Sequence, residues 1–165
     1  MEVSLLNSMV KQFKIIKLNE FSENGISTTV LKDGSEIYAT LTEKTVMFFK
    51  KVETLGDNAE DHPNVFSAIL TAGMSGGMFM NLRTAYDPET TILWVCYDVA
   101  TAGLTAGNLE TAAEHFIENA DNYSNFLKSV ITEAYLGENT TPEGRATEGT
   151  PVGNRLNNIQ NLLSI

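Results

Sequence analysis

MFMNLRTAYDPETTILWVCYDV, residues 78–99, is the stretch that decides the fold. Its first arm alternates, with Met78, Met80 and Leu82 on one side, which is the period of a strand with one buried face. Residues 87–90, DPET, carry turn chemistry, because proline presets φ and aspartate can accept hydrogen bonds from nearby backbone N–H groups. The sequence therefore predicts a β-hairpin.

The second arm of this hairpin is apolar on both faces over residues 92–97, ILWVCY. A strand tolerates this pattern only when something covers each side of the sheet. Burying one such side chain is worth ~1.5–3 kcal/mol relative to exposure. We therefore expect a helix on one face and assign a partner chain to the other.

Composition limits the class of protein. The 165 residues are most simply one domain with a tail, and a hydrophobic content of 42% fits a globular chain with a sizeable core. The formal net charge is −10, and we find no basic patch, so phosphate backbones and anionic membrane surfaces would be repelled. We expect neither a nucleic-acid partner nor a membrane partner.

The one cysteine, Cys96, lies in the most apolar strand, which favours a small core residue over a thiol catalyst. One cysteine forms no intrachain disulfide, which suits a reducing compartment. The amino-terminal residues lack the basic flank and apolar run of a secretion signal, and no stretch approaches the ~18 apolar residues of a membrane span. These features predict a cytoplasmic protein.

A short amphipathic helix is expected near the amino terminus, with Ser4 as its cap. Its apolar residues recur at helical spacing and form one stripe: Leu5, Leu6, Met9, Val10 and Phe13. Two interpretations stay open with equal weight. The helix is either docked on its own sheet or forms the wall of a groove for a peptide partner.

Three short strands are expected at residues 26–31, 36–41 and 45–52, because these segments are rich in β-branched and aromatic residues. The connections between them are of hairpin length, so they should form an antiparallel meander. The third strand, like residues 92–97, is apolar on both faces. We expect its sheet to be covered on one side and contacted on the other.

Two further helices are expected. A short one has Asp61 as its cap, Pro63 in its first turn and Gly73 at its end. A long one begins near Thr105 or Asn108 and is expected to end at Gly137. Its apolar residues step by four and three along one face: Leu109, Ala113, Phe116, Ala120, Tyr123, Leu127, Val130 and Ala134. Such a stripe favours a helix laid across a sheet over a coiled-coil seam.

Candidate catalytic residues are few. Residues 73–77, GMSGG, match the G-x-S-x-G pattern of serine hydrolases, but that elbow needs a strand leading into a helix, and here a helix leads into a strand. The two histidines, His62 and His115, and the one cysteine show no metal-ligand spacing. No phosphate-binding or dinucleotide fingerprint occurs. We expect no metal, no cofactor and no enzymatic activity, and a binding protein fits better.

The expected order of helix, three strands, short helix, two strands and long helix, in a small acidic chain, resembles the class I type III secretion chaperones, which include the Tir chaperone. The resemblance is carried by HPNVFSAILTAG (62–73), GGMFMNLRTAYDPETTILWVCYDV (76–99) and the helix at 108–136. It covers about residues 4–136 and is cumulative, since no motif is individually specific. It implies an α+β domain over residues 1–136. Beyond it the chain departs from the family, whose core is shorter. Residues 138–155 are rich in Gly, Thr, Pro and Glu without apolar periodicity, so a flexible tail is expected at 137–165.

The resemblance also implies a function and two surfaces. The chain would be a bacterial homodimer that holds the amino-terminal segment of a secreted effector extended until the secretion apparatus takes it. The effector surface of the family corresponds here to Leu5, Leu6, Met9, Phe13, Val30 and Tyr38. The dimer interface corresponds to Val65, Phe66, Ile69, Leu70, Phe79 and Asn81. For the tail, binding to a component of the secretion apparatus and simple disorder both stay open.

A second interpretation is a dimeric protein-binding adaptor or regulatory domain that is unrelated to secretion. It stays open because a fold hosts many functions, and the resemblance rests on the order of elements.

Overall fold

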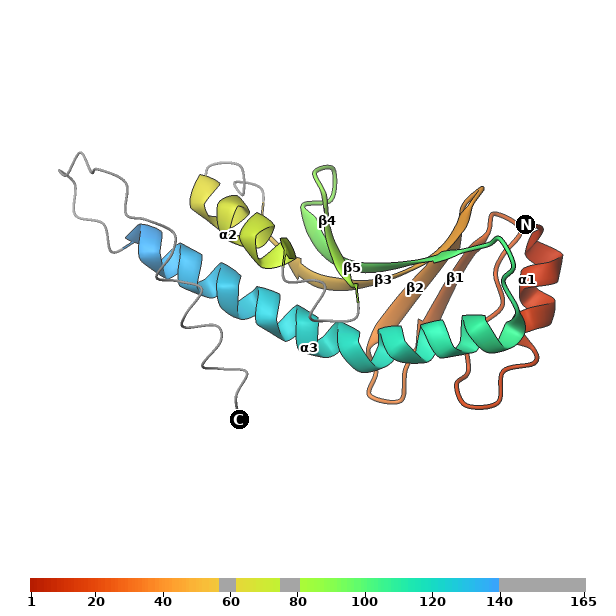
Figure 1. Ribbon diagram of the computed structural model, residues 1–165. Coiled ribbons are helices and arrows are strands. Elements are labelled where there is room, and N and C mark those ends of the chain that lie inside the picture. The colour runs from red at the N-terminus through yellow and green to blue at the C-terminus, as the bar shows by residue number, and fades with distance from the viewer. Residues whose placement is uncertain (57–61, 75–80, 140–165) are drawn as a thin grey trace.

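The computed structural model describes residues 1–56, 62–74 and 81–139. Within these residues the order of helices and strands confirms the predicted α+β arrangement (Figure 1). The elements are α1 (Val3–Val10), β1 (Ile26–Val30), β2 (Glu36–Leu41), β3 (Thr45–Thr54), α2 (Pro63–Gly73), β4 (Arg83–Asp87), β5 (Ile92–Ala100) and α3 (Ala106–Asn139). The described residues contain no helix that is both long and apolar enough to cross a membrane.

The five strands form one antiparallel sheet in the spatial order β1-β2-β3-β5-β4. β1, β2 and β3 are the predicted meander, and β4 and β5 are the predicted hairpin. They join because β3 pairs with β5 along its whole length, from Thr45 opposite Ala100 to Thr54 opposite Ile92, with one irregularity between Lys51 and Glu53. The meander and the hairpin therefore share a single sheet.

The tight turns follow the chemistry expected from the sequence. Asp87 Oδ1 accepts a hydrogen bond from the Glu89 N–H at 3.0 Å, and Asp87 Oδ2 accepts one from the Thr90 hydroxyl at 2.5 Å. In the turn between β1 and β2, Asp33 accepts from the backbone and hydroxyl of Ser35. Gly34 supplies the positive φ of 84° that this turn requires.

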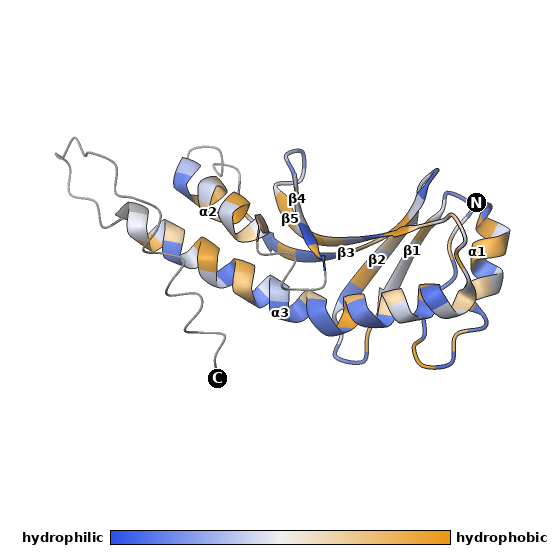
Figure 2. Cartoon of the chain, in the orientation of Figure 1, coloured by the Kyte–Doolittle hydropathy of each residue, from blue (hydrophilic) through white to orange (hydrophobic). Residues whose placement is uncertain are grey.

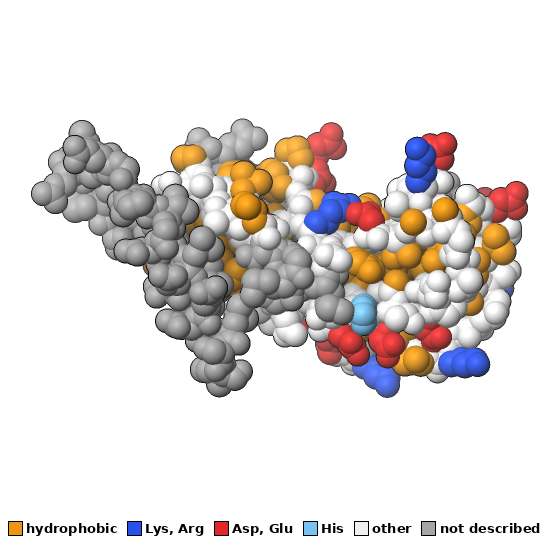
Figure 3. Space-filling model, viewed as in Figure 1, with side chains coloured by type: hydrophobic (Ala, Val, Ile, Leu, Met, Phe, Trp, Pro, Cys, Tyr) orange, Lys and Arg blue, Asp and Glu red, His pale blue; other side chains and the backbone are white. Residues whose placement is uncertain are grey.

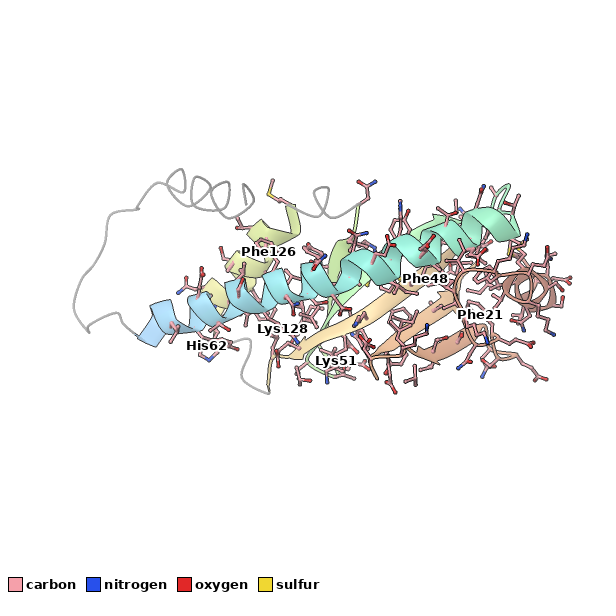
Figure 4. All side chains as sticks on the ribbon, turned by 90° about the horizontal axis from the view of Figure 1, so that it is seen from below. Phe21, Phe48, Lys51, His62, Phe126 and Lys128 are labelled. Carbon is pink, nitrogen blue, oxygen red and sulfur yellow. The ribbon has the colours of Figure 1, made fainter. Side chains whose placement is uncertain are left out.

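α3 covers one face of the sheet with the predicted apolar stripe (Figures 1 and 4). Six stripe residues are buried, namely Leu109, Ala113, Phe116, Ala120, Tyr123 and Leu127, while Val130 and Ala134 are partly buried against the same core. Phe116 stacks on Phe48 of β3 with ring centroids 5.9 Å apart. Figure 2 shows the amphipathic pattern of α3. Hydrophobic and hydrophilic residues alternate along the ribbon as successive residues fall on the inner and the outer face of the helix.

α2 packs against α3 and extends the core past the sheet. Its buried residues are Val65, Ile69 and Ala72. Phe66 meets Tyr86 of β4 edge-on at 5.0 Å, and His62 meets Tyr135 of α3 edge-on at 4.8 Å. The helix ends at Gly73 as expected, whereas Asp61, the expected cap, lies outside the described residues.

α1 is docked at the amino-terminal end of α3 through Leu6 and Val10, which are buried. The side-chain amide of Asn7 pairs with the backbone of Phe21 in both directions, at 2.9 and 2.7 Å. The expected cap at Ser4 is wrong. The helix begins at Val3, and the Ser4 hydroxyl bonds the carboxylate of Glu2 instead of a backbone N–H group.

Some element boundaries differ from the sequence prediction, those of β4 and α3 by the most. β4 begins at Arg83, because Asn81 has a φ of 65°, which interrupts an extended strand, and residues 78–80 of the predicted arm lie outside the described residues. α3 passes through Gly137 and ends at Asn139, since a glycine within a helix costs only about 1 kcal/mol relative to alanine. The predicted tail from residue 140 onward lies outside the described residues, so its flexibility stays a prediction.

One buried carboxylate fixes the segment that follows α1. Glu110, in the first turns of α3, is 9% exposed and accepts hydrogen bonds from the N–H groups of Lys14, Ile15 and Ile16 at 2.5, 2.6 and 3.4 Å. The bond from Ile15, with those from Lys14 and Ile16, lowers the pKa of Glu110 against the opposing effect of desolvation. The Glu110 carboxylate therefore holds residues 14–16, the segment that follows α1, against α3.

Glu110→Gln should make stability less sensitive to acid. A carboxylate whose pKa is lower in the folded state stabilises the fold above its unfolded pKa, and this contribution is lost as the pH falls through the folded pKa. We expect the free energy of unfolding at pH 7 to fall in Glu110→Gln, and its decline below about pH 5 to flatten relative to wild type. Urea unfolding at several pH values measures this, with the exposed Glu118→Gln as control. If the free energy of unfolding declined equally with acid in Glu110→Gln and in wild type, the proposed role of the Glu110 carboxylate would be contradicted.

Candidate partner-binding surface

The sheet has a second face, which points away from α3. The burial of β3 alternates, so that Val46, Phe48 and Val52 face α3 and Met47 and Phe49 face the other way. Residues opposite each other in antiparallel strands share a face, so the register assigns the remaining strands. We call this second face the open face. It comprises Ile26, Thr28, Val30, Glu36, Tyr38, Thr40, Met47, Phe49, Lys51, Arg83, Ala85, Trp94, Cys96 and Asp98.

Three aromatic rings form the centre of the open face. Phe49 stacks on Tyr38 at 5.4 Å between ring centroids, and the edge of Trp94 meets Phe49 at 5.3 Å and Tyr38 at 5.6 Å. The rings come from β2, β3 and β5, and all three side chains remain partly exposed. Such pairs are worth about 0.5–1.5 kcal/mol beyond their buried area, so they favour this arrangement of the rings. We call the cluster of Tyr38, Phe49 and Trp94 the aromatic platform.

The aromatic platform is bounded by exposed aliphatic and charged groups. On β1, Ile26 is 50% exposed and Val30 is 60% exposed. Arg83 Nε donates to Asp98 at 2.6 Å, and its Nη2 lies 3.0 Å from the sulfur of Met47. The bond to Asp98 is the main reason that the pKa of Arg83 is raised. This ion pair is half-exposed, so it contributes more to the shape of the surface than to stability.

Figure 3 shows how apolar side chains gather on the molecule. A band of them crosses the right half of the view, over the sheet and its junction with α3, with charged side chains above and below it. A second group lies over α2. These two areas correspond to the sheet and to α2, which together carry six of the twelve predicted binding residues.

Cys96 lies on the open face beneath its neighbours and is 3% exposed. Burial raises the pKa of the Cys96 thiol to about 11. The thiol is therefore protonated at neutral pH and is a poor nucleophile. The side chain packs as a small apolar residue, which agrees with the sequence interpretation.

The six residues predicted to bind a partner fall in two places. Val30 and Tyr38 lie on the open face, one cross-strand row apart. The other four, Leu5, Leu6, Met9 and Phe13, belong to α1 and the turn after it. Leu5 is 51% exposed, Met9 and Phe13 are partly buried, and Leu6 is fully buried in the core. The structure thus docks α1 on the rest of the chain and leaves Leu5 available to a partner.

The six residues predicted for the dimer interface are also divided. Val65 and Ile69 are buried inside the chain, and Phe66 packs on Tyr86. Leu70, by contrast, is 72% exposed and Asn81 is exposed, whereas Phe79 lies outside the described residues. Met74 follows Leu70 by one helical turn and is 88% exposed. The outer side of α2 therefore presents Leu70 and Met74 to solvent.

Sequence reasoning missed Phe49, Trp94 and Met47 as candidates for partner binding. The signal was present, because the strands that contain them are apolar on both faces. Which alternate residues face α3 depends on the pairing of β3 with β5. That pairing joins residues between 38 positions apart, at Thr54 and Ile92, and 55 positions apart, at Thr45 and Ala100. Only the sheet order places Tyr38, Phe49 and Trp94 in one cluster.

The motifs associated with catalysis or metal binding gain no support from the part of the chain that the structure describes. Gly73 ends α2, and Ser75 to Gly77 of the G-x-S-x-G pattern lie outside the described ranges. Among the described residues, no three His, Cys, Asp or Glu side chains are grouped so as to hold a metal ion.

Comparison with known proteins adds information at the level of the fold. No family model and no curated protein sequence match this chain. Several solved structures resemble it, and three of them are described here. A chain of the ExsC–ExsE complex has 14% identity and a TM-score of 0.56, with 77% of this chain and 97% of that chain covered.

The second is a chain of the HopA1–SchA chaperone–effector complex, with 10% identity and a TM-score of 0.54 over 74% of this chain and 91% of that one. The third belongs to the complex between the Yersinia pestis type III secretion chaperone SycH and a fragment of YscM2. It has 14% identity and a TM-score of 0.46, and covers 73% of this chain and 98% of that one.

Proposed function

We propose that this chain, which has the fold of the class I type III secretion chaperones, is a cytoplasmic, non-enzymatic homodimer that binds the amino-terminal segment of a secreted effector in an extended state and keeps it competent for secretion. The observation that carries the proposal is the open face. Its partly exposed cluster of Tyr38, Phe49 and Trp94 lies on the side of the sheet opposite α3.

The chemistry of the open face suits an unfolded segment better than a small molecule. The aromatic platform is shallow and extends over three strands, so several side chains of an extended peptide can contact it at once. Val30 and Ile26 continue the apolar surface to the β1 edge. The net charge of −10 disfavours nucleic acid as the occupant and suits a client segment that is neutral or basic.

The structural neighbours support a role of this kind. The HopA1–SchA structure is a chaperone–effector complex, so a similar fold binds an effector there. In this chain the proposal assigns the client to the open face, together with Leu5 of α1. The carboxyl-terminal residues beyond 139 are left as a candidate contact for the secretion apparatus.

The dimer is proposed to form through the outer side of α2. Leu70 and Met74 are separated by one helical turn and are among the most exposed large apolar side chains of the described residues. Burying two such side chains against a second copy would stabilise the pair by about 3–6 kcal/mol before the cost of association. Val65 and Ile69 support this interface from inside, because they hold α2 on α3.

Capture of the client tests the function directly. We expect the tagged protein, purified from lysate of its source cell, to retain one or a few secreted proteins that mass spectrometry can identify. Limited proteolysis should show protection of these proteins near their amino termini only. Recovery of a regulator or a cytoplasmic enzyme, bound through a folded domain, would favour the adaptor interpretation and contradict ours.

Variants locate the client surface. Phe49→Ser removes the central ring of the platform and should weaken client binding about thirtyfold or more, as expected for a buried aromatic anchor. Ile15→Ser is the matched control, because Ile15 is 69% exposed but lies outside the open face. Circular dichroism confirms folding, and titration of the recovered client gives the affinities. Equal binding by Phe49→Ser and Ile15→Ser would exclude the platform.

Leu70→Asp should convert the dimer to a monomer. A carboxylate buried at the interface would be unpaired, so we expect the dimer dissociation constant to rise about a hundredfold or more. Light scattering at micromolar concentration should give twice 18.1 kDa for wild type and 18.1 kDa for the variant. Thr71→Asp, one residue along the exposed side of α2, is the control for added charge. A wild-type mass of 18.1 kDa would contradict the proposed dimer.

A further inference from the structure

The open face has no helical cover among the described residues. α3 lies on the opposite side of the sheet, and no described helix lies over the aromatic platform (Figure 1). The three rings of the platform are partly exposed, and Val30 beside them is 60% exposed. A contiguous apolar surface of this kind is stabilised when an apolar segment covers it. Any such segment within reach would therefore bind it in the client-free protein as well.

Residues 156–165, LNNIQNLLSI, differ from the rest of the chain beyond α3. Half of these residues are apolar and none is charged. We call them the apolar segment. Four of its aliphatic residues recur at the spacing of one helix face: Leu156, Ile159, Leu162 and Leu163. A segment of this composition gains stability by burying its side chains, whereas the highly charged segments typical of disordered chains do not.

The chain between α3 and the apolar segment is long enough to reach the open face. The hydroxyl of Tyr135 donates to the backbone oxygen of Leu55 at 3.3 Å, so the end of α3 lies beside the end of β3. Lys51, labelled in Figure 4, is four residues back along β3 and lies opposite Trp94. The path from the end of α3 past these residues and across the sheet is about 40 Å. Residues 140–155 extend to about 53–58 Å, so the apolar segment can reach the platform of its own chain.

The charges of the two surfaces are compatible. The open face carries two acidic and two basic side chains, and one of each forms the ion pair between Arg83 and Asp98. The apolar segment brings no charge of its own into this contact. Residues 150–165 contain one arginine and no acidic residue, so they are not repelled by a chain whose net charge is −10. The segment therefore has the neutral or basic character that the proposed function assigns to a client.

The linker makes even a weak contact effective. A short flexible linker gives an effective concentration in the millimolar range. A segment with a dissociation constant of about 1 mM would then cover the face in about half of the molecules. Such a cover shields the aromatic platform part of the time and still yields to a client that binds more tightly.

We propose that the apolar segment covers the aromatic platform of its own chain when no client is bound, in about half of the molecules at any moment. This regulation of the client site rests on the proposed function. The client and the segment compete for one surface, so the apparent affinity for the client is lowered about twofold. Client binding in turn frees the segment, and its exposure distinguishes loaded from empty protein.

Quenching of Trp94 in the client-free protein tests the cover. The open variant is the full chain with the four aliphatic residues replaced: Leu156→Ser, Ile159→Ser, Leu162→Ser and Leu163→Ser. Its acrylamide quenching constant should be about twofold higher than that of wild type, because its platform is always open. The matched control replaces four polar residues of the same segment and should equal wild type: Asn157→Ser, Asn158→Ser, Gln160→Ser and Asn161→Ser. Equal constants for wild type and the open variant would overturn the proposal.

A peptide added to the open variant tests where the segment binds. The probe is a capped peptide of residues 150–165, which contains no tryptophan. It should protect Trp94 saturably, with a dissociation constant of about 1 mM. Adding Phe49→Ser to the open variant should weaken this binding about tenfold or more, whereas adding Ile15→Ser, at a site outside the open face, should not change it. No saturable protection up to about 10 mM, or equal binding by these two variants, would overturn the proposal.

Mixed dimers identify the chain that supplies the segment. The open variant is combined with a chain that keeps the wild-type segment and carries Trp94→Phe, so that all tryptophan fluorescence comes from the open variant. We expect the quenching constant of the open variant to be unchanged in the mixture. Protection of Trp94 in the mixture would assign the cover to a second copy and overturn the proposal that each chain covers itself.

Failure of this inference is distinguishable from failure of the proposed function. The open variant should bind a recovered client about twofold more tightly than wild type, and equal affinities would overturn the competition. A client that protects Trp94, together with equal client-free quenching of wild type and the open variant, would overturn the cover and leave the function standing. Recovery of no secreted client would overturn the function, while the client-free quenching would still decide whether the segment covers the platform.

Discussion

The rest of the structure depends on the contact between α3 and the sheet. Within this contact Phe116 of α3 stacks on Phe48 of β3. α3 has 34 residues and is about 50 Å long, whereas five strands are only about 20 Å wide. One helix therefore covers the sheet and still extends beyond it, where α2 packs against it. Among the described residues the cover comes from this one direction, so no described helix lies over the apolar side chains on the other face of β3 and β5.

Polar groups within this contact fix how the helix lies on the sheet. Asp121 meets Lys50 of β3, the hydroxyl of Tyr123 lies 2.9 Å from that of Thr84 on β4, and Glu110 holds the segment after α1. These bonds join α3 to three separate parts of the chain. Apolar burial supplies most of the stabilisation, and these partly buried polar bonds favour one register of α3 on the sheet over alternatives.

Much of the fold could be predicted because its signals are local. The stripe of α3, the DPET turn and the strand at residues 36–41 follow from short-range periodicity and turn chemistry. The cap at Ser4 and the stop at Gly137 were wrong, because both depend on small local energies. The pairing of β3 with β5 is a long-range contact, so neither the single sheet nor the aromatic platform could be read from the sequence. Tyr38 was predicted, whereas its neighbours Phe49 and Trp94 were not.

The fold of a class I type III secretion chaperone, together with an apolar sheet face that no described helix covers, leads to the central proposal that a client segment covers the open face. Trp94 is the chain's one tryptophan and lies in that face, so its fluorescence reports on this surface alone. The most direct measurement is acrylamide quenching of Trp94 in the free protein and in the complex with a client segment that lacks tryptophan. The account predicts strong quenching in the free protein and clear protection, with a blue-shifted emission, in the complex. Equal quenching in both would show that the client binds elsewhere and would contradict the account.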